Sequence, residues 1–157
     1  MQASGEDLRA LMRRFPAGVA VVSVDLGGQR LGLTVGTLIP LSLEPPLIGF
    51  AVRREAALHE LLREARTFGV SLLAAGQEHV AQHFARGVPP IALWERIEVR
   101  NGAGPPLLAG AVGWIVGVIA NEVKAGEDTF FVGEVSSVED GPGTRPLVYV
   151  DQAYVPA

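Results

Sequence analysis

The stretch GLTVGTLIPLSLEPPLIGFAV, residues 32–52, decides the fold of this chain. Apolar residues at 31–35 and 47–52 form two short runs whose length and composition indicate buried strands. The connection between the runs is too long for a tight hairpin, and its notable residues are small, hydroxylated or proline: Gly36, Thr37, Ser42, Pro45 and Pro46. Side chains of this kind leave backbone N–H groups open to a bulky ligand, so the stretch is predicted to hold an anionic cofactor.

Further strands and helices are predicted on both sides of this stretch. A valine-rich run at 18–24 predicts a strand, and a turn at 25–29 returns the chain antiparallel through 30–35. Helical spacing of apolar residues predicts helices near 8–15, 58–65 and 77–85, whereas 68–73, 96–100, 111–123, 129–138 and 147–150 are strand-like. Gly113 and Gly117 predict a bend in the strand at 111–123. Since regular βαβ alternation is missing, the pattern predicts a mainly β fold, an antiparallel barrel with helices inserted between its strands.

The composition bounds the class of protein. The 157 residues, 48% hydrophobic and 19% charged, suffice for one core, so residues 1–157 are predicted to form a single domain. No apolar run approaches the ~18 residues of a membrane-spanning helix, and the N-terminal segment lacks an apolar signal-peptide core. These features predict a cytoplasmic protein with no membrane partner. The absence of cysteine removes thiolate chemistry, and a net charge of −4 argues against a nucleic-acid partner.

Several familiar motifs are missing from the sequence. It contains neither the glycine-rich dinucleotide fingerprint, nor a P-loop, nor the G-x-S-x-G turn of serine hydrolases. His79 and His83 stand four residues apart on a predicted helix, a spacing that can bind a metal. With no obvious third ligand, an exposed helical pair is the better interpretation, and no metal site is predicted.

The residues that could act together follow the two strands of the opening stretch. Thr34, Gly36 and Thr37 end one strand, and Arg53 and Arg54 end the other. If these strands were neighbours, hydroxyls and amides would orient a phosphate while the guanidinium groups bound it through charge-assisted hydrogen bonds. A Gly/Thr turn beside two solvated arginines explains the same residues equally well, and spacing alone does not decide between the two interpretations.

Four segments, in order along the chain, resemble the flavin reductase-like family with the FMN-binding split β-barrel. LMRRFPAGVAVVSV resembles the opening helix and strand of that family, and GLTVGTLIPLSLEPPLIGFAV resembles its G-x-T-x-S-S…S-x-x-P-P-L stretch. TFGVSLLAAGQEHVAQHFA resembles F-x-V-N-x-L…Q-E-x-x-A-x-x-F-A, and GEDTFFVGEV resembles G-D-H-T-x-F-x-G-E-V. Together the segments cover nearly the whole chain.

The resemblance implies an NAD(P)H:flavin oxidoreductase that binds FMN, or FAD, and takes NADH or NADPH as co-substrate. It also implies a homodimer, and a monooxygenase component as a possible partner that receives the reduced flavin. The residues that the resemblance assigns to the flavin come from three segments: Thr34, Val35, Gly36, Thr37 and Ser42 for the ring edge or phosphate, Arg53 and Arg54 near the phosphate, and Phe84 and Ala85 at the end of the third helix.

Two residues that depart from the family pattern suggest functions other than that of a flavin reductase. Asp128 stands where the family has histidine, and a carboxylate there would repel an anionic nicotinamide cofactor, whereas an imidazole could donate a proton. Glu55 stands in the segment expected to bind phosphate. One alternative is therefore a flavin-binding or sensing module with weak or no nicotinamide-dependent activity. Another is a barrel that has kept only the fold, because fold alone does not fix function.

Overall fold

The computed structural model describes residues 2–157, in which two antiparallel sheets and several helices form. The strands of the larger sheet are β2 (Ala20–Leu26), β3 (Gln29–Val35), β4 (Ile39–Leu43), β5 (Pro46–Arg53), β6 (Thr67–Leu72), β7 (Gly113–Ala125) and β8 (Asp128–Asp140). The smaller sheet consists of β1 (Ala17–Gly18), β9 (Leu147–Val150) and β10 (Ala153–Pro156). The helices are α1 (Gly5–Met12), α2 (Ala57–Ala65), α3 (Glu78–Ala85) and α4 (Pro90–Leu93).

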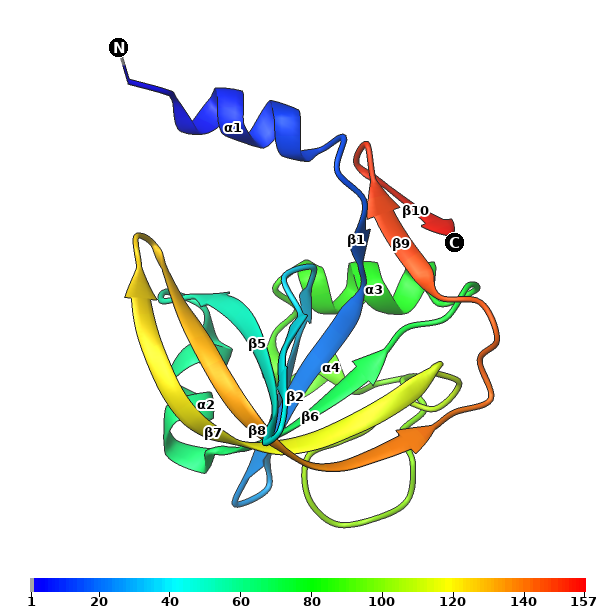
Figure 1. Cartoon of the computed structure of the whole chain (residues 1–157). Helices are drawn as coiled ribbons and strands as arrows, with labels where there is room; N and C mark the ends of the chain where they lie inside the picture. The colour runs from blue at the N-terminus through cyan, green and yellow to red at the C-terminus, as the bar shows by residue number, and fades with distance from the viewer. Residues whose placement is uncertain (1) are drawn as a thin grey trace.

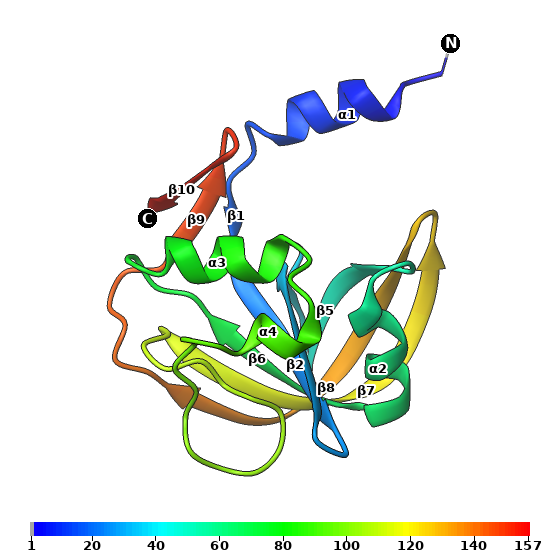
Figure 2. The same cartoon turned by 180° about the vertical axis from the view of Figure 1, so that it is seen from behind.

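The larger sheet has the strand order β3-β2-β6-β7-β8-β5-β4 and curves around the core (Figure 1). Every pairing is antiparallel, and β3 and β4, which follow one another in the chain, form the two edges. The predicted mainly β fold, with antiparallel strands and helices inserted between them, is confirmed. Helix α3 packs against β3 and β2 and α4 against β3, whereas α2 packs against β2, β3, β5 and β6 (Figure 2).

The core of the barrel contains phenylalanines from β5, β6 and β8. Phe50, Phe68 and Phe131 are each 0% exposed, and the rings of Phe50 and Phe68 meet edge to face with centroids 5.2 Å apart. The Phe68 ring lies against Gly117 and Gly133, where an added Cβ would come within 2.8 and 2.4 Å of it. Glycine is therefore required at both positions, because any side chain would overlap the ring.

The longest hairpin joins β7 to β8 and is bent. Its register shifts between Val116 and Gly117 and again between Ile119 and Asn121. Bulges of this kind increase the bend of a strand, so the predicted bend at 111–123 is confirmed. The hairpin ends in a turn at Gly126, whose φ of +60° suits glycine.

The sequence analysis missed β4. Residues 36–46 were interpreted as one long connection, but Ile39–Leu43 pairs with β5, and the turn between them contains a cis Glu44–Pro45 bond. All of β4 except Ser42 is exposed. A strand with no buried face has no alternation of apolar and polar residues, so the usual strand signal was missing here.

The segment between α4 and β7 crosses the outside of the barrel with little regular structure. The strand predicted at 96–100 reduces to a single bridge between Val99 and Leu108. Two buried hydroxyls fix the segment: Ser23 Oγ donates to the Pro106 carbonyl over 2.6 Å, and Ser71 Oγ accepts from the Leu108 amide over 2.9 Å. Two backbone hydrogen bonds beside the bridge, Arg100 N to Leu107 O and Ala109 N to Glu98 O, complete the contacts of this segment in place of the predicted strand.

Helix α1 stands away from the barrel at the N-terminal end of the chain (Figure 1). Ser4 caps this helix, since its Oγ accepts from the Asp7 amide over 3.0 Å. None of the residues of α1 is buried. Among residues 2–157, no helix is long and apolar enough to cross a membrane.

Candidate functional site

The candidate site lies where the two edges of the larger sheet approach one another, at the end of β3. Strands β3 and β5 are not hydrogen-bonded neighbours, so the simplest form of the predicted arrangement is wrong. They are nevertheless joined through Thr37, whose Oγ1 accepts from the Ala51 amide over 2.9 Å and lies 3.4 Å from the Ala51 carbonyl. The Thr37 hydroxyl thus takes the place of a backbone partner for β5 and holds the start of the β3–β4 connection against that strand.

The same end of β5 carries the two arginines. The antiparallel register sets Arg53 opposite Asp128, the first residue of β8. The Arg54 guanidinium donates to the carbonyls of Gly126 and Asp128, and its backbone amide donates to the Glu127 carbonyl over 3.0 Å. Arg54 therefore fixes the turn that presents Asp128, and Thr37, Arg54 and Asp128 all contact one end of β5 or its partner.

Arg53 is paired with carboxylates on the surface. Its guanidinium lies 3.2 Å from Glu55 and 3.9 Å from Glu127. Exposed pairs of this kind contribute about 0–1 kcal/mol, so an anion can displace them. Glu55 therefore points to Arg53, and the Arg53 guanidinium would have to leave these carboxylates before it could bind a phosphate.

Four more predicted residues lie on β3 and α3. The Thr34 hydroxyl donates to the Ala81 carbonyl of α3 over 2.7 Å, so it binds the helix to the strand. Val35 and Phe84 are 5% and 2% exposed and belong to the core, whereas Ala85 is exposed at the end of α3. Val35 can therefore contact a ligand only through its backbone. The Thr34 hydroxyl has already donated its proton to Ala81 and can only accept a hydrogen bond from a ligand.

Ser42 is separated from the rest of the predicted site. It lies on β4 opposite Leu47, at the far end of β5 from Arg53. Leu47 lies four positions along β5 from Ala51, the partner of Thr37, which at ~3.3 Å per residue is about 13 Å. Ser42 therefore does not converge with Thr37, and the prediction that these hydroxyls act together has no geometric support.

The residues at this end of the barrel fit a flavin. None of the loop and turn hydrogen bonds within residues 2–157 uses the Gly36 or Thr37 amide as donor. An added Cβ at Gly36 would meet nothing closer than 3.5 Å, so the backbone there is open to approach. Free amides there suit the polar ring edge or the phosphorylated chain of a flavin nucleotide.

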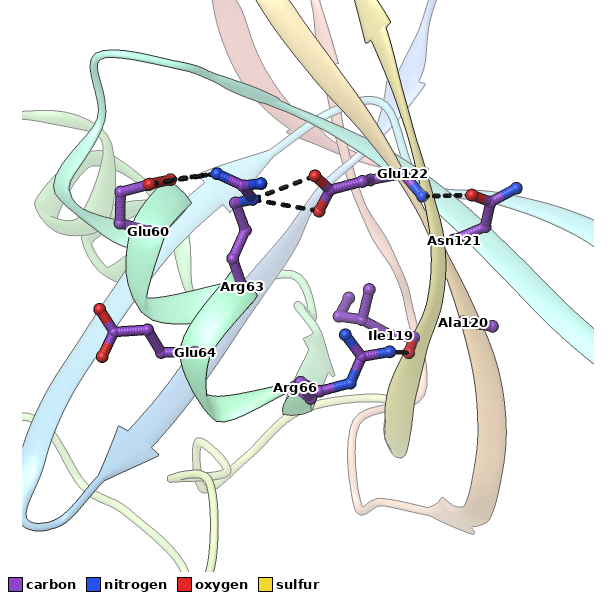
Figure 3. Close-up of a pocket in the computed structure, with 8 residues that line it drawn as sticks. All are labelled: Glu60, Arg63, Glu64, Arg66, Ile119, Ala120, Asn121 and Glu122. Atoms are coloured by element: carbon purple, nitrogen blue, oxygen red, sulfur yellow. Dashed lines mark hydrogen bonds and ion pairs between the residues drawn. The ribbon is translucent and has the colours of Figure 1, made fainter.

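A charged pocket of about 500 Å³ lies elsewhere, between the end of α2 and β7 (Figure 3). Its two arginines already have partners: Arg63 lies 3.2 Å from Glu60 and 3.0 Å from Glu122, and Arg66 donates to the Ile119 carbonyl over 2.6 Å. Since its carboxylates outnumber its arginines, this pocket is a poor site for an anionic cofactor.

Comparison with known proteins decides the family. The family model described as "Flavin reductase like domain" matches residues 12–157. The chain belongs to the flavin reductase-like family. This confirms the family that the four sequence segments predicted.

Relatives with established names cover most of the chain. It is 36% identical over 146 residues to "NADH-dependent FAD reductase" of Streptomyces globisporus, covering 90% of this chain and 80% of that protein. It is 37% identical over 149 residues to "4-hydroxyphenylacetate 3-monooxygenase, reductase component" of Thermus thermophilus, covering 95% and 94%. Among solved structures, BorF, the flavin reductase component of a bacterial two-component tryptophan halogenase, matches with a TM-score of 0.89 and 34% identity over 98% of each chain.

Sequence reasoning missed a buried histidine beside the family's G-D-H-T turn. His59 of α2 is 6% exposed, and its Nε2 lies 2.7 Å from Oγ1 of Thr129, the residue after Asp128. Its Nδ1 lies 2.8 Å from a Glu60 carboxylate oxygen. No local pattern marks His59, because its partner Thr129 is 70 residues away. The contact ties α2 to the start of β8 and so fixes the backbone that carries Asp128.

The other histidines do not form a metal centre. His83 Nε2 lies 2.6 Å from the Leu93 carbonyl, and His79 is exposed. Over residues 2–157 no cluster of three or more His, Asp or Glu side chains could hold a metal ion.

Glu60, the partner of His59, is expected to make the stability of the protein depend on pH in the acid range. Its hydrogen bond from His59, together with Arg63, lowers the pKa of this carboxyl from its usual value. A lowered folded-state pKa stabilises the protein above the unfolded value, ~4.3 for Glu, and this stabilisation is lost as pH falls through the folded value. We expect Glu60→Gln to flatten the dependence of Tm on pH below about pH 4.5. Thermal melts from pH 7 to pH 3 measure this, and an unchanged slope would contradict it.

Proposed function

We propose that this protein is an NAD(P)H-dependent flavin reductase that binds FMN or FAD at the end of β3 and β5. One observation carries the proposal. The Thr37–Ala51 contact and the Arg54-bound turn place open backbone amides and Asp128 at one end of the barrel. Relatives named as FAD reductase and as a monooxygenase reductase component support the same activity.

The flavin, when bound, accepts hydride from the nicotinamide and passes electrons on. The chain has to hold and orient it. The Gly36 and Thr37 amides would donate to its polar edge, and Thr37 would keep that loop against β5. Arg54 would hold the turn at 126–128 so that Asp128 stays in place. A monooxygenase component that takes the reduced flavin is the proposed partner, and the cytoplasm, as the place of the nicotinamide pool, is the proposed location.

Two measurements test this function. Purified protein is titrated with FMN and with FAD and followed by the visible spectrum, and NADH or NADPH oxidation is then followed at 340 nm. We expect a shifted flavin spectrum at micromolar concentrations and oxidation that depends on added flavin. If neither FMN nor FAD binds, the proposal is wrong.

The Thr37 hydroxyl provides a matched pair of variants. Thr37→Val keeps the shape of the side chain but leaves the Ala51 amide without its acceptor. A net hydrogen bond is worth about 0.5–1.5 kcal/mol, so flavin binding should weaken roughly threefold to tenfold. Thr37→Ser keeps the hydroxyl and should bind as the unchanged protein does. Equal weakening in both variants would show that the hydroxyl does not position the loop.

A second candidate function is a flavin-binding module with little or no turnover of nicotinamides. The observation in its favour is Asp128, half-buried at the turn where the family pattern has histidine. In that case flavin would bind, but NADH and NADPH would reduce it slowly. Stopped-flow mixing of the flavin-loaded protein with each nicotinamide separates the two functions.

A homodimer of one domain spanning residues 1–157 is part of the proposal. Helix α1 and the turn after it present apolar residues to solvent: Leu8, Leu11, Met12 and Phe15 are 61%, 63%, 48% and 67% exposed. Contiguous exposed apolar residues at helical spacing mark an interaction surface. A second copy is the occupant that we propose for this apolar surface.

This apolar surface predicts a clear effect on assembly. Leu11→Glu puts a charge on a surface whose leucine would contribute about 1.5–3 kcal/mol when buried, so the dimer should dissociate tenfold to hundredfold more readily. Arg13→Glu places the same side chain about 200° away around the helix and should leave the dimer intact. Sedimentation velocity over a range of concentrations measures both, and an identical mass distribution for the two variants would contradict the assignment.

A further inference from the structure

The pair His59 and Thr129 lies on the inner face of β8, directly behind the candidate site. Thr129 follows Asp128 on this strand, and successive residues of a strand point to opposite faces of a sheet. The Asp128 side chain therefore lies on the outer face beside Arg53, its partner on β5, whereas the Thr129 side chain is buried on the inner face. Phe131, two residues further on, packs on the His59 ring with centroids 5.4 Å apart.

The hydrogen bonds of His59 determine which ring nitrogen carries the proton. Its Nδ1 lies 2.8 Å from a Glu60 carboxylate oxygen, and its Nε2 lies 2.7 Å from Thr129 Oγ1. The hydrogen bond from His59 lowers the pKa of the Glu60 carboxyl, so this group is ionised near neutral pH and can only accept. In the neutral ring the proton therefore lies on Nδ1, and the Thr129 hydroxyl donates to Nε2.

A hydroxyl, an imidazole and a carboxylate in this order also occur in enzymes that use a nucleophile. In this protein the hydroxyl is closed off from substrates. Thr129 is 5% exposed and is paired with Val52 on one side and with Lys124 on the other. The array therefore acts within the fold, on the backbone that carries Asp128.

The carboxylate that orients His59 is itself held in place (Figure 3). Arg63, one turn further along α2, lies 3.2 Å from Glu60 and 3.0 Å from Glu122 of β7. These contacts join the helix to the β7–β8 hairpin at a second point. The imidazole is thus oriented from its Nδ1 side, and its Nε2 is presented to β8.

Asp128 is therefore restrained from two sides. On one side the Arg54 amide donates to the carbonyl of Glu127, the residue before Asp128, over 3.0 Å. On the other side the hydroxyl of Thr129, the residue after Asp128, is bound to His59. A half-buried carboxylate that loses one of these restraints is expected to turn toward water, because a charge is better solvated there.

We propose that His59, acting through Thr129, holds the Asp128 carboxylate at the candidate site and so limits the rate at which a nicotinamide reduces the flavin. The inference rests on the proposed function, because it assigns a further residue to that reaction. His59 is a positioning residue and not a catalytic one, since it is buried behind the strand and acts through its neighbour.

Hydrogen exchange in the flavin-free protein tests the contact without turnover. Thr129→Val keeps the shape of the side chain and removes the hydroxyl, so the turn at 126–128 should open more often. The Arg54 amide, which is bonded to this turn, should then exchange about twofold to tenfold faster, the range that one net hydrogen bond gives. Thr129→Ser keeps the hydroxyl and should exchange as the unchanged protein does. An unchanged Arg54 rate in Thr129→Val would overturn the proposal.

Ser71→Ala supplies the control for a general loss of stability. It removes another buried hydroxyl, the acceptor of the Leu108 amide, on β6, which is paired with neither β5 nor β8. We expect the Arg54 amide to exchange in this variant as in the unchanged protein. Equal acceleration in Ser71→Ala and Thr129→Val would mean that the turn responds to stability alone, and the proposal would be wrong.

Nitrogen NMR of the unchanged protein keeps the proposal open to test if Thr129→Val does not fold. The neutral His59 ring should carry its proton on Nδ1, with Nε2 as the acceptor. A proton on Nε2 would show that the Thr129 hydroxyl does not donate to the ring and would overturn the assigned arrangement.

Stopped-flow reduction of the bound flavin connects the contact to the reaction. In Thr129→Val we expect reduction at saturating NADH to be about threefold faster, part of the roughly tenfold expected for removal of the charge. Flavin affinity should not change. In an Asp128→Asn background the same substitution should leave the rate as it is, because the charge is absent. Acceleration of equal size in both backgrounds would show that Thr129 does not act through Asp128.

The outcomes separate this inference from the function on which it rests. If the unchanged protein reduces bound flavin and Thr129→Val does so at the same rate, the positioning role of His59 is wrong and the reductase function stands. If the unchanged protein binds no flavin, or binds it and does not reduce it with NADH or NADPH, both are wrong.

Discussion

Asp128→His is expected to raise the rate at which NADH reduces the bound flavin about tenfold. Asp128 is half-buried at the start of β8, opposite Arg53, in a turn fixed by Arg54. We expect its carboxylate to oppose the approach of an anionic nicotinamide and the gain of negative charge on the flavin. A unit charge ~10 Å away at an effective dielectric constant of ~20 costs about 1–2 kcal/mol, which is roughly tenfold in rate.

Asp128→Asn separates the two contributions of this substitution. It removes the charge without adding an imidazole, and its shape matches that of Asp128 closely. Equal acceleration in both variants would assign the effect to electrostatics alone, whereas acceleration only in Asp128→His would assign it to proton donation by the imidazole. The measurement is stopped-flow reduction at saturating flavin and varied NADH. Unchanged reduction in both variants would remove Asp128 from the mechanism, and slower reduction in both would contradict the expected repulsion.

The fold could be predicted wherever one face of an element is buried. The β2–β3 hairpin, α2 and α3 were found because their apolar residues recur with the period of a strand or helix. Strand β4 was missed because it has no buried face, and β10 because its four residues are too few to show a period. The segment after α4 is held by side-chain hydrogen bonds from Ser23 and Ser71, which leave no periodic pattern in the sequence.

The site was predictable only in part, because its geometry depends on distant pairings. The resemblance led to Thr37, Arg54 and Asp128, but their proximity follows from the pairing of β5 with β8 and from the Thr37–Ala51 contact. Ser42 was grouped with them because it lies in the same stretch of sequence, yet β4 carries it away along β5. His59 could not be found from the sequence, since nothing near it points to Thr129, 70 residues away.

Phe68→Ala is expected to lower the free energy of unfolding by about 3–5 kcal/mol, the usual cost of removing a buried phenylalanine ring. The ring is 0% exposed and occupies the space left by Gly117 on β7 and Gly133 on β8. Both strands bend where they pass it, and the hairpin that they form ends in the turn beside Arg54. Urea unfolding followed by circular dichroism measures the change, and a loss below 1 kcal/mol would contradict it.

Gly133→Ala tests whether the Phe68 ring and Gly133 are in direct contact. Its Cβ would lie 2.4 Å from the Phe68 ring, so in the unchanged protein we expect a loss of about 1–3 kcal/mol from overpacking. In the Phe68→Ala background the same methyl group enters the empty space and should cost little. Additive effects of the two changes would show that the contact is not direct, because only residues in contact couple strongly. Coupling would mean that the bend of the β7–β8 hairpin, and with it the position of Asp128, depends on a ring packed in the core of the barrel.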